Sequence, residues 1–259
     1  GYDLHHDIGY GADGELLALA EEVGGETVED RLLSIDLETG EVTQLLDFSQ
    51  LMEPYFEMTR KVGPTDDFFW QAGEWDWLHL NSLQYMPEDD SLIVSSRETS
   101  AIIKVKGLHS QPELDWLAGD GRFWQDTPYA GLCLTQVGDF VPQYGQHCVE
   151  YLADGEEDGV YYLAVYNNNY WSLNSRDFTL EVADSVGTGL YLTDDETSQV
   201  YVYRIDENDR TFALEDSFDV PYSSIVSNGS QCGDQGNWVV NSGVAMVFGE
   251  YDADGELIR

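Results

Sequence analysis

The stretch from His79 to Val94, which reads HLNSLQYMPEDDSLIV, contains the pattern on which the fold depends. A polar residue opens one strand, residues 87–90 form an acidic turn, and the apolar run of residues 92–94 forms the next strand. Because this pattern recurs along the chain, it predicts a repeat protein rather than an isolated hairpin.

The starts of successive copies lie about 70 residues apart, farther than the roughly 40–50 residues of compact propeller blades. The four copies span residues 6–19, 79–94, 147–165 and 224–240. A strand, a tight turn and a second strand are also predicted in residues 33–42, 202–209 and 248–255. Four short strands per repeat make a blade. We therefore predict an all-β fold, a β-propeller, that forms a single domain over residues 1–259.

Two longer connections separate the repeats. Residues 49–76 include a short helix predicted from Ser49 to Thr59, and residues 107–146 are rich in Gly, Pro and aromatic side chains. Both connections are interpreted as loops on a rigid scaffold, where binding and catalytic residues are often found.

The chain is strongly acidic, since 50 Asp and Glu residues face 11 Lys and Arg and give a formal net charge of −39. Such a surface repels nucleic acid and anionic membranes, so nucleic acid is excluded as a partner. No run of about 18 apolar residues occurs, and no membrane span is predicted. Repulsion among the carboxylates also predicts that added salt stabilises the fold.

The three cysteines, Cys133, Cys148 and Cys232, show no CxxC motif and no zinc-type spacing. A disulfide between Cys133 and Cys148 and three free thiols are both compatible with their positions. The sequence predicts no metal site and no cofactor.

Three of the five histidines, His6, His79 and His147, open the first strand of successive repeats. In a propeller the first strand of each blade lines the central channel, so these side chains are predicted to meet at one site. His5 and His109 have no such repeat support, and we assign them structural roles. A metal-dependent, lactonase-like propeller is disfavoured, because it needs carboxylates on the axis where the repeats place histidines.

Arg97 follows the second strand of the second repeat. A guanidinium group binds sulfate, phosphate or carboxylate through two parallel hydrogen bonds. If Arg97 lies beside the histidines, it would bind an anionic substrate. The alternative is that Arg97 forms a salt bridge with one of the many carboxylates of the chain. Asn168, in an Asn-rich run after the third apolar strand, either orients a substrate or belongs to an ordinary turn.

The segments DWLHLNS at residues 76–82 and DDSLIVSSRETSAIIK at residues 89–104 closely resemble the bacterial aryl-sulfate sulfotransferases. Further positions that are similar to this family, in the same order, are residues 5–7, 146–147, 198–206 and 222–225. The resemblance implies a six-bladed propeller in the periplasm or outside the cell. The small N-terminal β-sandwich domain of some members is not expected in this sequence.

The resemblance also implies an activity. A sulfuryl group would pass from a phenolic sulfate ester to a phenolic acceptor through a covalent sulfo-histidine, without a nucleotide sulfate donor. In this assignment His79 and Arg97 hold sulfate oxygens, His147 donates or accepts the proton, and Asn81 and Asn168 contact the substrate. The expected partners are a small-molecule aryl sulfate donor and a phenolic acceptor.

Two positions depart from the family pattern. The family arginine on the strand of residues 198–203 is Gln199 here, and residues 243–247, which match the family's usual nucleophilic histidine, read GVAMV. The sulfuryl group is therefore expected on His6 or His147. The alternative is a non-catalytic propeller that binds an anionic or aromatic ligand, or a protein partner, at its central mouth.

Overall fold

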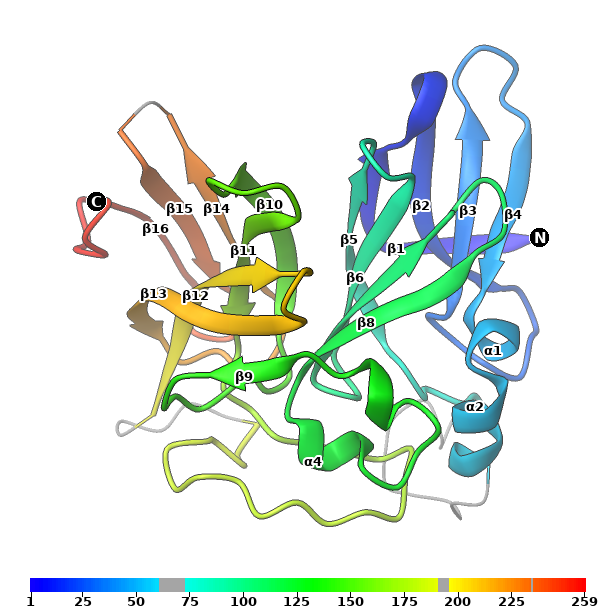
Figure 1. Ribbon diagram of the computed structural model, residues 1–259. Helices are drawn as coiled ribbons and strands as arrows, with labels where there is room; N and C mark the ends of the chain where they lie inside the picture. The colour runs from blue at the N-terminus through cyan, green and yellow to red at the C-terminus, as the bar shows by residue number, and fades with distance from the viewer. Residues whose placement is uncertain (61–72, 191–195, 234) are drawn as a thin grey trace. The chain divides into compact units, whose positions relative to one another are not determined.

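The computed structural model describes residues 1–60, 73–190, 196–233 and 235–259. In this part of the chain the fold is all-β, as predicted, with four sheets of the propeller-blade type (Figure 1). A six-bladed ring stays a prediction. The chain divides into two compact units. Unit 1 comprises residues 1–117, 121–133 and 173–180, and unit 2 comprises residues 118–120, 134–172 and 181–259.

The first two sheets are four-stranded, and their strands follow one another in chain order. One sheet comprises β1 (Tyr2–Tyr10), β2 (Glu15–Glu22), β3 (Arg31–Asp36) and β4 (Val42–Asp47). The other comprises β5 (Leu80–Met86), β6 (Ser91–Ser96), β7 (Ala101–Lys106) and β8 (Glu113–Gly119). β1 and β5, the innermost strands of the two sheets, contact each other. This contact brings residues at the starts of two blades together.

Burial in unit 1 follows from the position of each strand in its blade. Residues 17–20 of β2 and 92–94 of β6 are fully buried apolar runs, because a central strand is covered on both faces and needs no alternation. In β1 the exposed side chains include Leu4 and Ile8, at 54% and 60% exposure. In unit 1, the apolar strand of each repeat therefore becomes the buried second strand of its sheet.

Unit 2 contains the other two sheets, whose innermost strands, β10 and β14, also contact each other. One sheet comprises β10 (His147–Asp154), β11 (Val160–Asn167), β12 (Thr197–Asp206), β13 (Thr211–Pro221) and β9 (Thr135–Val137). The other comprises β14 (Ser227–Cys232), β15 (Asn237–Ser242) and β16 (Val247–Tyr251). Their common core contains Tyr166, Val200, Trp238 and Val240.

In the residues that the structure describes, helices lie in the connections between strands. They are η1 (Ala12–Gly14), α1 (Phe48–Leu51), α2 (Glu53–Thr59), α4 (Gly121–Trp124) and η2 (Ala130–Leu132). The helix predicted from Ser49 to Thr59 is confirmed, as α1 and α2. The interpretation of residues 107–146 as a loop is wrong in part, because this segment contains β8 and β9. Both are outermost strands of their sheets. Such strands are short and only partly covered, so their apolar pattern is too short to predict a strand from the sequence.

Each innermost strand has a non-glycine residue in the left-handed backbone region, in the middle of β1 and within two residues of the start of β5, β10 and β14. These residues are His6, His79, Cys148 and Val226, with φ of 52°, 52°, 55° and 49°. Such a conformation is uncommon outside glycine and redirects a side chain relative to regular strand alternation. His6 and His79 share it, whereas in the third blade Cys148 adopts it instead of His147.

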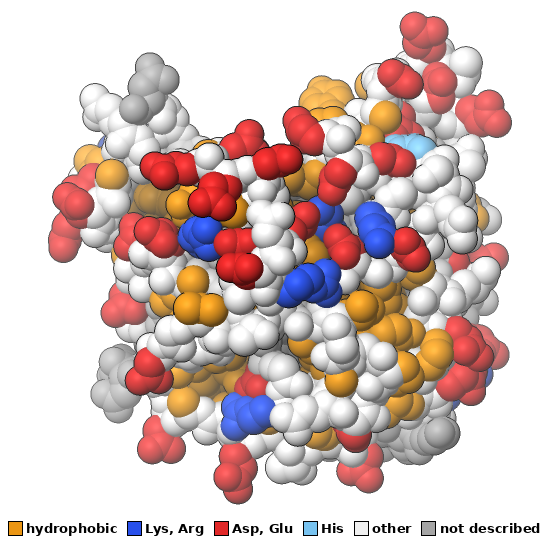
Figure 2. Space-filling view, in the orientation of Figure 1, with side chains coloured by type: hydrophobic (Ala, Val, Ile, Leu, Met, Phe, Trp, Pro, Cys, Tyr) orange, Lys and Arg blue, Asp and Glu red, His pale blue; other side chains and the backbone are white. Residues whose placement is uncertain are grey.

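Acidic side chains spread over the face of the molecule seen in Figure 2, among few Lys and Arg. Two of the buried cations contact carboxylates instead. Lys104 is 2% exposed and contacts Asp89 at 2.7 Å, and the Arg31 guanidinium contacts both Asp30 and Asp47. These two cations are therefore not available to neutralise other carboxylates on the surface.

Candidate functional site

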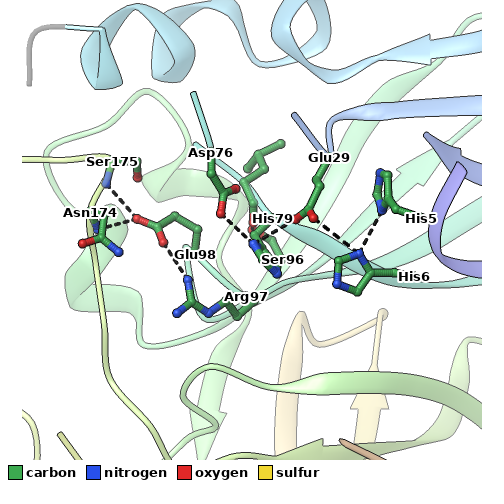
Figure 3. A network of polar contacts seen from close by, with 11 residues as sticks. His5, His6, Glu29, Asp76, His79, Ser96, Arg97, Glu98, Asn174 and Ser175 are labelled. Carbon is green, nitrogen blue, oxygen red and sulfur yellow. Dashed lines mark hydrogen bonds and ion pairs between the residues drawn. The ribbon is translucent and has the colours of Figure 1, made fainter. Parts of the chain in front are cut away.

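The site in unit 1 forms where β1 contacts β5. His6 lies on β1 and His79 immediately precedes β5, and their rings meet edge to face with centroids 5.2 Å apart (Figure 3). The two residues are 73 positions apart in the sequence and come from consecutive blades. Two of the three histidines that were predicted to meet thus lie together, although His6 lies in the middle of β1 and does not open it.

Two buried carboxylates hold the ring of His79. Asp76 Oδ2 lies 2.6 Å and Glu29 Oε2 2.9 Å from His79 Nδ1. Asp76 precedes β5 by four residues, whereas Glu29 comes from the connection between β2 and β3 and has a left-handed φ of 57°. Sequence reasoning missed both residues as site members. Asp76 lay within the family-like segment, but no pattern in the sequence pointed to Glu29.

These contacts set the charge of the histidines. Burial alone would lower the pKa of His79, but Asp76 and Glu29 outweigh burial and raise it to about 10. The raised pKa favours the imidazolium form of His79 at neutral pH. Burial lowers the pKa of His6, against the opposing effect of Glu29. The two adjacent rings thus favour opposite protonation states, one cationic and one neutral.

His5 also belongs to this cluster, although the sequence suggested only a structural role for it. Its Nδ1 lies 2.9 Å from His6 Nδ1, and burial lowers its pKa to about 4. The signal that could have found it is the pair His5-His6 itself, because a left-handed residue in a strand places neighbouring side chains on the same side.

Arg97 is joined to His79 through the backbone, and its side chain turns to Glu98 (Figure 3). Its backbone N–H donates to the carbonyl oxygen of His79 at 3.1 Å, and its guanidinium contacts Glu98 at 3.2 Å. The salt bridge that the sequence left open as an alternative is thus present. Glu98 is buried and accepts hydrogen bonds from the backbone N–H groups of Asn174 and Ser175. Burial raises the pKa of Glu98 to about 7.

Comparison with known proteins identifies the family. Residues 1–258 match the family model described as Arylsulfotransferase (ASST). The chain belongs to this family. No curated protein matches it. A chain from "Crystal Structure of Mitotic Checkpoint Complex" aligns at 11% identity and a TM-score of 0.39, over 97% of this chain and 63% of that one. At this TM-score the likeness bears on neither fold nor function.

Three other residues assigned by the family resemblance have clear surroundings. Asn81 is buried on β5 in unit 1. In unit 2, His147 begins β10, and its Nδ1 lies 2.7 Å from Asn168 Oδ1. The Asn168 amide donates to the carbonyl oxygen of Ser223 at 2.7 Å. The side chain of Asn168 therefore orients the His147 ring within unit 2.

The two departures from the family pattern have structural counterparts. Gln199, on β12, accepts a hydrogen bond from the Asn167 amide at 2.9 Å and donates to Asp219 at 3.3 Å. Residues 243–246 connect β15 to β16, and Met246 is 89% exposed. No arginine or histidine stands at these positions.

Two further sequence expectations concern cysteines and the membrane. Cys133, Cys148 and Cys232 are free thiols, so the alternative without a disulfide holds. Among the described residues, no helix is long and apolar enough to cross a membrane.

Proposed function

We propose that this arylsulfotransferase family member transfers a sulfuryl group from a phenolic sulfate ester to a phenolic acceptor, with His6 as the group that accepts it. The observation that carries the proposal is the contact between His6 and His79, beside Arg97, in a chain of this family. It supports a site in which a neutral imidazole lies next to the imidazolium of His79, with Arg97 joined to His79 through the backbone.

His79 and Arg97 bind the oxygens of the sulfuryl group in this proposal. Two carboxylates at 2.6 and 2.9 Å favour the imidazolium form of His79, in which both ring N–H groups are donors. The Arg97 guanidinium has five donors in a planar fork, and Glu98 contacts one of its nitrogens at 3.2 Å. Charged donors aimed at these oxygens stabilise the charge that develops in the transition state.

His6 supplies the nucleophile. Its side chain is 25% exposed, so the ring is reachable from solvent, and its Nδ1 faces His5 and Glu29. The lone pair on Nε2 forms an N–S bond while the S–O bond of the ester breaks and its electron pair leaves with the phenolate oxygen. The acceptor phenol then forms the new S–O bond, and the N–S bond breaks to return His6.

Proton transfer completes both half-reactions. The departing phenolate takes up a proton, and the acceptor phenol loses one. The family resemblance assigns this proton to His147, whose ring Asn168 orients within unit 2, and it assigns substrate contacts to Asn81 and Asn168. The substrates are small phenols and their sulfate esters, and the proposed location is the periplasm or the outside of the cell.

The test uses 4-nitrophenyl sulfate as donor and phenol as acceptor, with release of 4-nitrophenolate followed by absorbance. We expect turnover in the unmodified protein, and a sulfuryl adduct on the peptide containing His6 in donor-only incubations analysed by mass spectrometry. His6→Gln should lower the rate at least about a hundredfold. His109→Gln, which removes a histidine outside this site, is the matched control.

Three results would contradict the proposal. An adduct on His147 would move the nucleophile to unit 2. Turnover that is unchanged in His6→Gln would remove His6 from the reaction. Binding of the aryl sulfate without any turnover would favour the non-catalytic propeller.

A further inference from the structure

We propose that His5, His6 and Glu29 bind a divalent transition-metal ion, with Asp76 and His79 as the groups that hold Glu29 in place. The proposal concerns metal binding, which the sequence did not predict, and it stands independently of sulfuryl transfer. It rests on the placement of donor atoms and on buried carboxylate oxygens that lack hydrogen bonds.

The backbone of β1 brings both histidines to one side of the strand. Consecutive residues of a regular strand point to opposite faces. The pairing of β1 with β2 shifts register between Leu4 and Ile8, and His6 has a left-handed φ of 52°. The rings of His5 and His6 consequently meet at 5.1 Å between centroids, with their Nδ1 atoms 2.9 Å apart. Two lone-pair-bearing nitrogens this close need a shared proton or a shared cation.

Glu29 completes a three-ligand set. Its Oε1 lies 3.7 Å from His6 Nδ1, which is too long for a hydrogen bond. The donor atoms of His5, His6 and Glu29 all lie within 4.8 Å of one another. In a tetrahedral zinc site with bonds of about 2.0 Å, ligand atoms are about 3.3 Å apart. The set therefore needs only small side-chain adjustments to close around an ion.

The carboxylates of the cluster are buried without enough donors. Glu29 is 6% exposed, and its Oε2 lies 2.9 Å from His79 Nδ1 but receives no hydrogen bond from the described residues. The single Nδ1 proton of His79 serves Asp76 Oδ2 instead. Asp76 Oδ1 is likewise buried and without a hydrogen-bond donor in the described part of the chain. Buried carboxylates in this state are costly, and a bound cation lowers that cost.

His79 and Asp76 then act as the outer support of the site. Carboxylate ligands of metals are usually held by neighbouring hydrogen-bond or charge partners, which fix their orientation. Here His79 lies against Glu29, and Asp76 against His79 (Figure 3). Two imidazoles and one carboxylate are the ligand set of catalytic zinc sites and of some iron(II) sites, and they leave a coordination position open.

A metal at this place would also regulate the transferase reaction, an effect that rests on the proposed function. An imidazole that binds a metal through Nδ1 carries its proton on Nε2. That nitrogen then has no lone pair to attack sulfur. Metal binding and sulfuryl transfer by His6 should therefore exclude each other.

The binding test uses protein freed of metal by a chelator and then titrated with Zn²⁺ in a calorimeter. It is done at about 1 M salt, where a Debye length of about 3 Å weakens binding to scattered surface carboxylates. We expect one ion per chain, with affinity lowered at least about tenfold in His5→Gln, His6→Gln and Glu29→Gln. Co²⁺ should give visible d–d absorption that these variants lose. Circular dichroism melting verifies that each variant is folded.

His109→Gln is the matched control, because His109 also contacts two carboxylates but lies outside the cluster. Absence of a saturable Zn²⁺ site in the unmodified protein, or equal loss of affinity in His109→Gln, would overturn the metal proposal. Zn²⁺ binding that leaves 4-nitrophenyl sulfate turnover unchanged would instead contradict the role of His6 in transfer, while the metal site would stand.

Discussion

Unit 1 contains two histidines that are each held by two carboxylates, and they differ in how the ring is used. At His109, Asp90 lies 2.5 Å from Nδ1 and Glu15 lies 2.6 Å from Nε2, so the carboxylates contact both ends of the ring. At His79, Asp76 and Glu29 both contact Nδ1. The first arrangement makes the ring a cross-link between segments, and the second orients the ring from one side.

The two histidines also differ in burial and in the aromatic ring that lies next to them. The side chain of His109 is 28% exposed, and that of His79 is 15% exposed. Tyr85 is the aromatic neighbour of His109, whereas His79 lies beside the ring of another histidine. The same residue types thus produce a structural clamp at one place and a candidate reaction site at the other. The difference lies in which atoms the carboxylates contact.

The largest expected effect is the difference in turnover between variants that replace His79 and His109 one at a time. In His79→Gln the turnover of 4-nitrophenyl sulfate should fall at least about a hundredfold, because a charged donor to the sulfuryl group is lost. His109→Gln should change turnover less than about twofold, because no substrate contact is assigned to it. Steady-state rates with both variants at equal folded fraction test this. Equal losses in the two variants would remove the distinction between clamp and site.

A smaller effect is expected for Arg97→Ala. Loss of a charged, bidentate contact should weaken binding of inorganic sulfate about tenfold or more, as a charge-assisted hydrogen bond contributes about 1.5–3 kcal/mol. The matched control is Arg60→Ala, since Arg60 forms an exposed ion pair with Glu26. Calorimetric titration with sulfate measures both variants. Unaltered sulfate affinity in Arg97→Ala would show that Glu98 occupies the guanidinium completely.

The clamp at His109 predicts a pH dependence of stability. Burial alone would lower the pKa of His109, but Asp90 and Glu15 outweigh it and raise the pKa. A raised pKa means that the folded state favours the protonated ring, so the stabilisation is fully present below the ordinary value of about 6.5. It is lost as pH rises through the raised pKa.

The measurement compares unfolding free energies of unmodified protein and His109→Gln from about pH 6 upward. The difference should be about 1 kcal/mol or less, as for partly exposed ion pairs, and should shrink toward alkaline pH. A difference that grows as pH rises would have the wrong sign and would reject the clamp.

The mildest expected effect concerns the acidic surface. Salt should raise the melting temperature, because screening weakens repulsion among 50 carboxylates over a Debye length of about 10 Å at 0.1 M. Thermal melts at increasing NaCl concentration test this. If the melting temperature stays level or drops, repulsion is not a dominant destabilising factor, and the neutralised carboxylates around Lys104 and Arg31 explain why.

The sequence by itself determined the all-β class, the hairpins of the four repeats and the meeting of His6 with His79. These follow from local signals: turn residues, apolar strands, and a repeated position that the propeller architecture carries to one place. It also determined the family, because the segment around His79 and Arg97 is contiguous.

Only the tertiary structure decided which groups surround these residues. Glu29 reaches His79 from a connection 50 residues earlier, and Asn174 and Ser175 reach Glu98 from a segment more than 70 residues later. The left-handed backbone at His6 brings His5 to the side of Glu29 and His6. The residue types of β1 do not predict this conformation. Such contacts depend on how segments that are distant in the sequence pack against each other. The periodicity of apolar residues shows only which face of each segment is buried.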